Sequence, residues 1–95
     1  MTMTLKILPF DAADAFDTPQ SQAELLAEAL ESGQMESVIA ALNIITRAKG
    51  MTSMAKETGL SREALYRATG PQGNPTLSTL MAIVKSAGLK LSAAT

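Results

Sequence analysis

The part of the chain that most constrains its fold is the segment 52–67, in which two short helical patterns are separated by the turn sequence Gly59-Leu60-Ser61. Thr52 is placed to cap the first helix with its hydroxyl, Gly59 suits the positive φ at which that helix must end, and Ser61 is placed to cap the second helix. Two short helices joined by so tight a turn form a helix-turn-helix. The segment therefore predicts a sharp corner between two helices that pack against each other.

Apolar residues at helical spacing supply the packing between these two helices. Ala55 is small and stands one helical turn before Gly59, where the helices pass closest. Leu65 is turned back onto the first helix, and Met54 and Leu60 complete the apolar lining. The second helix is left with an outward polar face, which consists of Ser61, Arg62, Glu63, Tyr66 and Arg67.

A helix with this outer face fits the major groove of DNA. Arginine can make bidentate hydrogen bonds to guanine, and hydroxyls or backbone amides at the start of a helix can hold phosphate. The alternative is a helical hairpin whose polar face is only solvated. Four residues have the spacing that a helix-turn-helix requires, and they are Ala55, Gly59, Ser61 and Leu65. We therefore favour DNA binding.

The composition limits the chemistry that the chain can perform. A chain of 95 residues with 46% apolar but only 3% aromatic residues predicts one small domain with an aliphatic core, and it offers few rings on which single-stranded nucleic acid could stack. Because cysteine and histidine are absent, thiolate chemistry, disulfides, the usual zinc sites and imidazole bases are excluded. We therefore expect no catalytic residue, no metal and no cofactor.

No targeting or membrane segment is expected. Lys6 is followed by only a few apolar residues before Pro9 and Asp11, which is unlike a signal peptide. No apolar run approaches the roughly 18 residues of a membrane span. The prediction is a cytoplasmic protein without a membrane partner.

The formal net charge of −1 conceals a division between the two parts of the chain. Residues 1–40 hold one base and seven acids, a net charge of −6, whereas residues 41–95 hold seven bases and two acids, a net charge of +5. A basic half suits DNA phosphates, and an acidic half suits a basic protein partner. For the acidic half, an ordinary solvated helix face explains the charges equally well.

Capping signals predict three more helices. Thr18 with Pro19 begins the first, Gly50 ends the second and Gly88 ends the third. The second helix carries the longest apolar series, which Met35 extends, and it should be the most buried. On the first helix Ala23, Leu26, Ala27 and Leu30 share one face, opposite Glu24, Glu28 and Glu31. The three helices are expected at about 18–31, 34–48 and 77–87.

The remaining segments read as loops and short strands. Leu5–Leu8 and Leu89–Ser92 alternate like strands that can pair within the chain or across a dimer. Residues 11–17 predict a loop or a single turn. The predicted organisation is an extended segment at 1–17, a helical domain at 18–88 with its motif at 52–68, and a tail or short strand at 89–95.

A loop rich in glycine and proline follows the motif, at residues 68–75, and lies beside the predicted DNA face. Its polar residues can hydrogen-bond phosphate oxygens, or they can serve only the geometry of the turn. Both interpretations stay open for Gln72, Asn74 and Thr76.

Several motifs connect the chain with a known family. They are Pro9-Phe10-Asp11, Arg47-Ala48-Lys49-Gly50-Met51, Glu57-Thr58-Gly59-Leu60-Ser61-Arg62-Glu63 with Leu65-Tyr66-Arg67, Gly73-Asn74-Pro75-Thr76, and Gly88-Leu89-Lys90-Leu91. With these motifs, nearly the whole chain resembles the addiction-module antidote family, the HigA-like antitoxins of prophage-derived toxin–antitoxin pairs. This family falls within the wider Xre/lambda-repressor-like helix-turn-helix class.

The resemblance implies a homodimeric, all-α, five-helix protein that binds double-stranded operator DNA and represses its own operon. It also implies a partner, a small basic toxin of the RelE/ParE superfamily that the antitoxin neutralises. By position, the residues that read DNA fall on Ser61, Arg62, Glu63, Tyr66 and Arg67, with phosphate contacts from Thr52 and Ser53. Relatives often have glutamine at the position of Ser53. The serine side chain is shorter than that of glutamine, so it reaches less far from the first motif helix toward DNA.

Two further sets of contacts complete the predicted sites. Lys56, in the first motif helix, is expected to contact phosphate without reading sequence. No motif of the family marks the toxin contacts, which we assign to the acidic amino-terminal half. The assigned toxin contacts are Phe10, Asp11, Asp14, Phe16 and Asp17.

Three alternatives remain beside a DNA-binding antitoxin. The chain could be a prophage-type regulator without a toxin, or a protein-interaction module in which the helix-turn-helix is only a scaffold. Tight partner binding with a flat, salt-independent response to DNA would favour the module. An enzyme is the least favoured, because no carboxylate pair is marked as catalytic by its surroundings.

Overall fold

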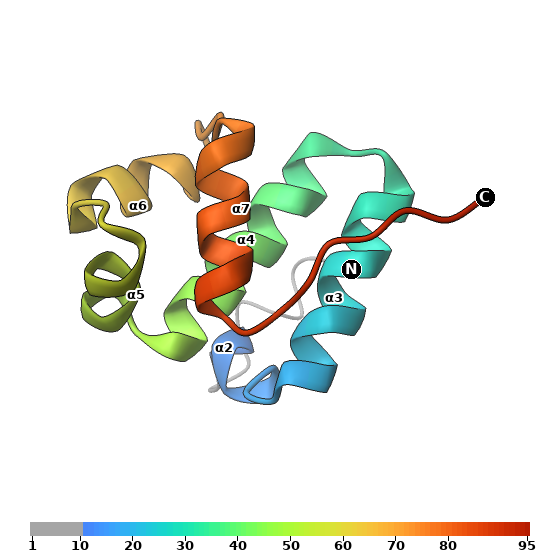
Figure 1. Cartoon of the computed structure of the whole chain (residues 1–95), viewed down its shortest axis with the longest axis horizontal. Helices are drawn as coiled ribbons and strands as arrows, with labels where there is room; N and C mark the ends of the chain where they lie inside the picture. Colours follow the sequence, from blue (N-terminus) through green and yellow to red (C-terminus); the bar gives the residue numbers. More distant parts are fainter. Residues whose placement is uncertain (1–10) are drawn as a thin grey trace.

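The structure, a computed structural model, describes residues 11–95, which form six helices and no strand. This confirms the all-α fold, with all five expected helices present. The stretch expected to hold a loop or a single turn contains a sixth helix of four residues, capped by the Asp11 carboxylate. The helices are α2 (Ala12–Ala15), α3 (Pro19–Ser32), α4 (Met35–Lys49), α5 (Met51–Thr58), α6 (Arg62–Ala68) and α7 (Leu77–Ser86) (Figure 1).

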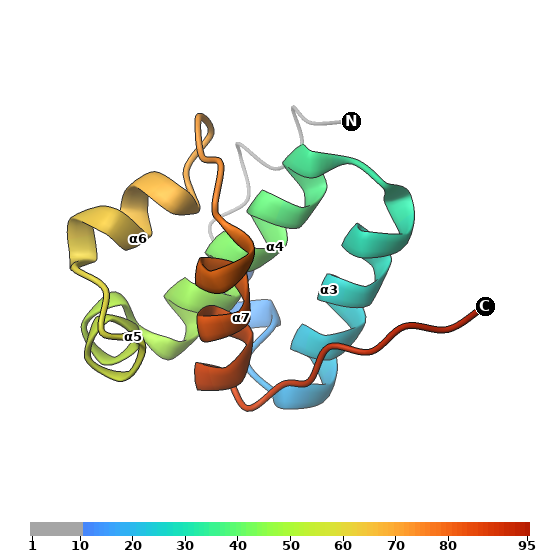
Figure 2. The same cartoon turned by 45° about the horizontal axis from the view of Figure 1, so that its top comes forward.

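The long helix α4 runs through the middle of the molecule and contacts α2, α3, α5 and α7. In Figure 1 α7 lies in front of it, α3 on one side, and α5 and α6 on the other; Figure 2 shows the same arrangement tilted. Leu42 and Ile45 are completely buried there, so α4 is the most buried helix, as expected. Met35 does not extend its buried face, because half of that residue is exposed at the start of the helix.

Local capping sets most of the helix boundaries. The Thr18 hydroxyl oxygen accepts a hydrogen bond from the Ser21 amide at 3.1 Å, and the Thr76 hydroxyl oxygen accepts one from the Thr79 amide at 3.1 Å. Gly33 ends α3 with a φ of +69°, in the left-handed region that glycine tolerates. These caps confirm the predicted starts of α3 and α7 and the predicted end of α3.

The carboxyl-terminal tail does not form the expected strand. The Leu89 amide donates to the Val84 carbonyl at 3.0 Å, so the chain is still completing the end of α7 where the strand was expected to begin. A strand also needs a partner, and residues 11–95 supply none. The other predicted strand, Leu5–Leu8, lies outside the described residues.

Helix α3 buries a different face from the one that its apolar residues mark. Leu26 is buried, but Ala23, Ala27 and Leu30 are exposed. The buried positions beside Leu26 are instead Ala29 and Gln22, whose side-chain amide donates to the Phe16 carbonyl at 2.9 Å. An apolar edge of α3 is therefore left without cover.

The helices between residues 11 and 95 are too short or too polar to cross a lipid bilayer. The longest of them, α4, has 15 residues.

Candidate nucleic-acid interface

Helices α5 and α6 form the predicted corner, but α5 begins earlier than expected. Thr52 was predicted as its N-cap and is wrong in that role, because α5 starts at Met51 with Gly50 as the capping residue. The Gly50 amide donates to the Thr46 carbonyl at 2.9 Å, and its carbonyl accepts from the Met54 amide at 2.9 Å. One glycine therefore closes α4 and opens α5, and no linker is left in which a hydroxyl cap could stand.

The turn between α5 and α6 has the predicted geometry. Gly59 has a φ of +78°, and its amide donates to the Ala55 carbonyl at 3.0 Å. The Ser61 hydroxyl oxygen accepts from the Ala64 amide at 3.0 Å and so caps α6. Thr58, to which the sequence pattern gave no role, braces the turn by donating to the Met54 carbonyl at 2.7 Å and accepting from the Leu60 amide at 3.2 Å.

The apolar side of the motif belongs to the core of the molecule. Leu65 and Met54 are completely buried, together with Ile83 of α7. Ala55 and Leu60 are partly buried and pack against the same cluster. The predicted apolar lining is thus confirmed, and the orientation of α6 is fixed by its single fully buried leucine.

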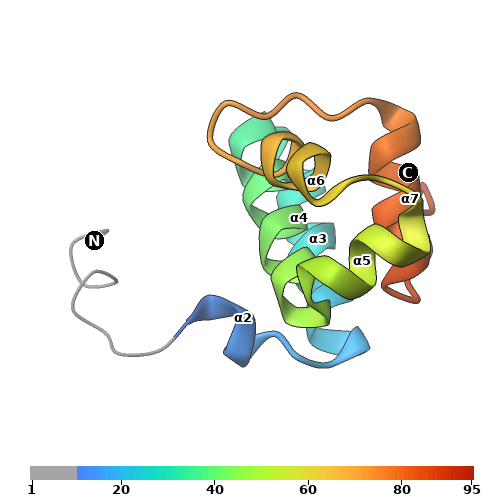
Figure 3. The same cartoon turned by 90° about the vertical axis from the view of Figure 1, so that its left-hand side faces the viewer.

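The residues predicted to contact DNA are all exposed. Tyr66 is 51% exposed, although its aromatic ring is largely apolar. Figure 3 shows that α5, α6 and the loop after α6 lie on one side of the molecule. The exposed predicted residues that these helices and this loop carry are Thr52, Ser53, Lys56, Ser61, Arg62, Glu63, Tyr66, Arg67, Gln72, Asn74 and Thr76.

The loop from 69 to 76 packs closely on the end of α6. A Cβ at Gly73 would stand 2.3 Å from the Ala68 carbonyl oxygen and 2.9 Å from the Arg67 carbonyl oxygen. The Gly73 amide donates to the Gly70 carbonyl at 2.9 Å. Among the loop's polar residues, Thr76 already serves α7 as its cap.

Replacing Gly73 with alanine should therefore destabilise the protein. Backbone carbonyls cannot move aside as the end of a side chain can, so we expect a loss of about 1–3 kcal/mol in the free energy of unfolding. Urea denaturation followed by circular dichroism measures it. Gln72→Ala, at the exposed neighbouring position, should change stability by less than about 0.5 kcal/mol. Equal stability of the two variants would show that the loop does not hold this close packing.

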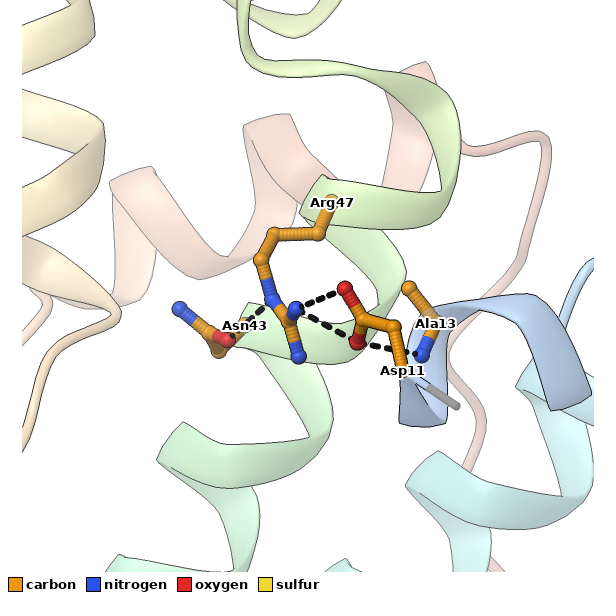
Figure 4. A network of polar contacts seen from close by, with 4 residues as sticks. All are labelled: Asp11, Ala13, Asn43 and Arg47. Atoms are coloured by element: carbon orange, nitrogen blue, oxygen red, sulfur yellow. Dashed lines mark hydrogen bonds and ion pairs between the residues drawn. The ribbon is translucent and has the colours of Figure 1, made fainter. Parts of the chain in front are cut away.

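A polar network joins α2, α4 and the end of α6, and Figure 4 shows its first part. The Arg47 guanidinium donates through Nη1 to both carboxylate oxygens of Asp11, and through Nε to the Asn43 side-chain oxygen at 2.8 Å. The Asn43 side-chain nitrogen donates in turn to the Thr69 hydroxyl at 3.3 Å. Thr69 is buried at the end of α6, so the chain of contacts reaches from α2 to the helix proposed to read DNA.

The environment of Asp11 favours its ionised form. The Ala13 amide donates to its carboxylate at 3.0 Å, and the Arg47 guanidinium donates to it as well. Together these bonds hold the pKa of Asp11 below its ordinary value of 3.8. The ion pair is exposed, with side-chain exposures of 36% for Arg47 and 48% for Asp11.

The lowered pKa of Asp11 gives a signed prediction for Asp11→Asn. A carboxylate with a lowered pKa stabilises the folded state above its ordinary pKa, and this stability is lost as the pH falls through the lowered value. Asparagine keeps the capping oxygen but not the charge. Wild type should be more stable than the variant at neutral pH, and the difference should vanish well below pH 3.8. Urea titrations across this range measure it, and a difference independent of pH would contradict it.

A groove of about 500 Å³ lies beside this network, along α4. Ala40 and Ile44 form part of its apolar wall, and Pro71 of the loop after α6 lies at its border. Arg47 and Asn43 also line it, so its polar edge is the network itself. No sequence pattern marked this groove. The sequence placed Arg47 in a family motif and as a positive charge in the last turn of its helix, where it complements the helix dipole, but it did not indicate the contact with Asp11.

The predicted toxin contacts lie around α2, at one end of this groove. Asp11, Asp14 and Asp17 are exposed, whereas Phe16 is half-buried and its carbonyl accepts from Gln22. Phe10 lies outside the described residues. Helices α2, α3 and the first turn of α4 carry further exposed acids and no base, and those acids are Glu24, Glu28, Glu31 and Glu36.

The described part of the chain contains no cluster of three or more potential metal-binding side chains. Within the same residues, every buried side-chain nitrogen or oxygen has a hydrogen-bond partner.

Comparison with known proteins identifies the family. A sequence model of the family described as "Probable addiction module antidote protein" matches residues 6–95. The chain belongs to this family. A protein of Haemophilus influenzae, described as uncharacterized, is 35% identical over 88 residues, which cover 93% of this chain and 91% of that protein. No solved structure matches the chain. Antidote proteins counteract toxins, so membership supports an antitoxin role and implies a toxin partner.

Proposed function

We propose that this antidote protein is a DNA-binding antitoxin of the HigA-like type within the Xre/lambda-repressor-like helix-turn-helix class. In this proposal it works as a homodimer, represses its own operon and neutralises a RelE/ParE-like toxin. The observation that carries the DNA-binding part is the division of α6, whose one buried leucine orients it while its polar residues are exposed. Two of these exposed residues, Arg62 and Arg67, carry positive charge, which suits a helix that binds DNA phosphates and bases.

The DNA-binding step follows from the shape and charge of this side. Helix α6 enters the major groove, where Arg62 and Arg67 can donate to guanine and Tyr66 can contact a thymine methyl or a phosphate. Lys56 on α5 neutralises a phosphate without reading a base. Two copies of α6 then occupy successive major grooves, about 34 Å apart.

Toxin binding is proposed for the side with α2 and the groove along α4. Asp14 lies on α2, Asp17 just after it and Glu36 in the first turn of α4, and none of the three pairs with a basic side chain within the described chain. An acidic surface beside an apolar groove attracts a basic protein and can seat an apolar side chain from it. In Figure 3 α2 and α7 lie on opposite sides of α4, so a toxin bound beside α2 would not cover α7.

Co-expression with the neighbouring gene tests the antitoxin role. A short basic reading frame beside this gene should arrest growth when expressed alone, and this protein should restore growth.

Asp14→Lys with Asp17→Lys should slow association with that toxin by on the order of tenfold or more, because the steering charge is reversed. Glu24→Lys with Glu28→Lys makes the same change of charge on α3 and serves as the control. An equal loss in both variants would contradict a contact centred on α2.

A further inference from the structure

The face that carries α7 and the tail exposes a group of large apolar side chains. Leu77 and Met81 of α7 are 71% and 53% exposed, Leu91 of the tail is 39% exposed, and Leu30 of α3 is 44% exposed. Monomeric proteins rarely leave so many large apolar residues together in water, and such groups mark interaction surfaces. We call these four residues the apolar strip.

Two shallow grooves make the strip continuous. One groove, of about 310 Å³, joins Met81 to Leu91, and the other, of about 290 Å³, joins Leu91 to Leu30. The tail residues Leu89 and Lys90 line both grooves. The strip therefore crosses from α7 over the tail to the apolar edge of α3, which the fold leaves without cover.

The position of the apolar strip relative to α6 favours a second copy of the chain as the molecule that covers the strip. In Figure 1 α7 and the tail lie at the front and α6 lies at the left, whereas in Figure 3 α6 faces the viewer and α7 lies at the right. Consider a two-fold axis that runs from left to right in the view of Figure 1 and passes in front of α7. Rotation about this axis leaves α6 of both copies on the same side of the dimer. The copies are then stacked along the shortest dimension, 26 Å, which is compatible with the roughly 34 Å between successive major grooves.

The charges beside the strip favour a second copy over a basic partner. Lys85 and Lys90 border it on α7 and the tail, and Glu31 borders it on α3. Within the described chain no ion pair joins these three residues. A two-fold dimer can set the bases of one copy against the acid of the other, whereas a basic toxin would meet two like charges.

We propose that the apolar strip is the homodimer interface of this protein, with α7 packed antiparallel on α7 of the second copy and Met81 close to the two-fold axis. This inference rests on the proposed function, because the placement of α6 on DNA helps to choose the axis. Leu77 of each copy then packs on the aliphatic stem of Lys85 of the other. The interface is isologous, so each substitution acts twice.

Sedimentation equilibrium of the full chain tests the interface. Wild type should be a dimer, and Met81→Glu should raise the dimer dissociation constant by about 100-fold or more, because two carboxylates would be buried near the axis. Met35→Glu is the matched control, since Met35 is also helical, is 49% exposed and lines neither groove. It should leave the constant unchanged. A monomeric wild type, or a Met81→Glu variant that dimerises like wild type, overturns the proposal.

Engineered cysteines give a second readout that survives if a charged variant folds poorly. The chain has no cysteine of its own, so single replacements report one position each. Met81→Cys should form a disulfide-linked dimer on mild oxidation much faster than Met35→Cys. Equal rates would overturn the interface.

If the strip dimerises but the dimer does not distinguish operator from random DNA, the interface stands and the proposed function falls. A monomer that reads its operator overturns the interface and leaves the proposed DNA reading intact.

Discussion

Replacing Leu65 with alanine should destabilise the protein by about 2–5 kcal/mol, the largest effect that we expect from a single change in the motif. Leu65 is completely buried and is the only buried residue of α6 before the helix cap. It packs in the same cluster as Met54 of α5 and Ile83 of α7. Because a small domain has a total stability of only about 5–15 kcal/mol, the variant should lie close to its unfolding threshold.

The control for this prediction is the next residue in the same helix. Tyr66 is 51% exposed, so Tyr66→Ala should change the free energy of unfolding little while it weakens DNA binding. Urea denaturation followed by circular dichroism measures both variants. If Leu65→Ala were no less stable than Tyr66→Ala, the packing of α6 onto the core would be wrong.

Replacing Arg62 with alanine should weaken binding to the operator by about 1–3 kcal/mol and leave binding to random DNA nearly unchanged. Arg62 is the first residue of α6 and is exposed, and α6 lies on the same side of the molecule as α5 (Figure 3). A guanidinium that pairs with one base adds to the difference in binding free energy between operator and random DNA, because random DNA has that base at the contacted position only occasionally. The ratio of the two dissociation constants is the quantity to measure.

Lys56→Ala supplies the contrast. A lysine that contacts only phosphate should, when removed, weaken binding to both DNAs alike and lower the slope of log K against log salt by about one. Both variants remove one positive charge, so a general effect of charge would act equally in them. If Arg62→Ala and Lys56→Ala had the same effect on discrimination, α6 would not be the helix that reads sequence.

The helix boundaries were largely predictable because capping is local. Thr18, Ser61 and Thr76 each cap the helix that follows them through a hydrogen bond to an amide three residues on. The start of α5 was mispredicted because Gly50 can serve two helices at once, and the sequence offered Thr52 as a better hydroxyl cap. That choice depends on how α4 and α5 meet, which is a tertiary property.

The burial of α3 and the tail could not be predicted for the same reason. Helical periodicity finds an apolar face, but it does not say which part of that face will be covered. Helix α3 packs on α4 and buries Gln22, Leu26 and Ala29, so its apolar edge at Ala23, Ala27 and Leu30 faces water. The tail alternates like a strand, yet Leu89 completes the end of α7.

The residues predicted for DNA contact are exposed, and this was predictable because they are what remains when the buried leucines are assigned. The network of Asp11, Arg47, Asn43 and Thr69 was not predictable. Its ion pair joins residues 36 positions apart, and its last bond joins residues 26 positions apart. A sequence pattern carries no signal at such separations, so the groove beside the network was invisible as well.

The most direct test of DNA reading is a fluorescence-anisotropy titration of the wild-type protein. One probe is the DNA upstream of its own gene and the other is a scrambled sequence of the same length, each at two salt concentrations. A sequence-reading antitoxin predicts tighter binding to the upstream DNA, with affinity for both probes falling as salt rises. Equal binding to both probes, or no binding to either, would contradict the proposal and leave toxin binding as the role of this fold.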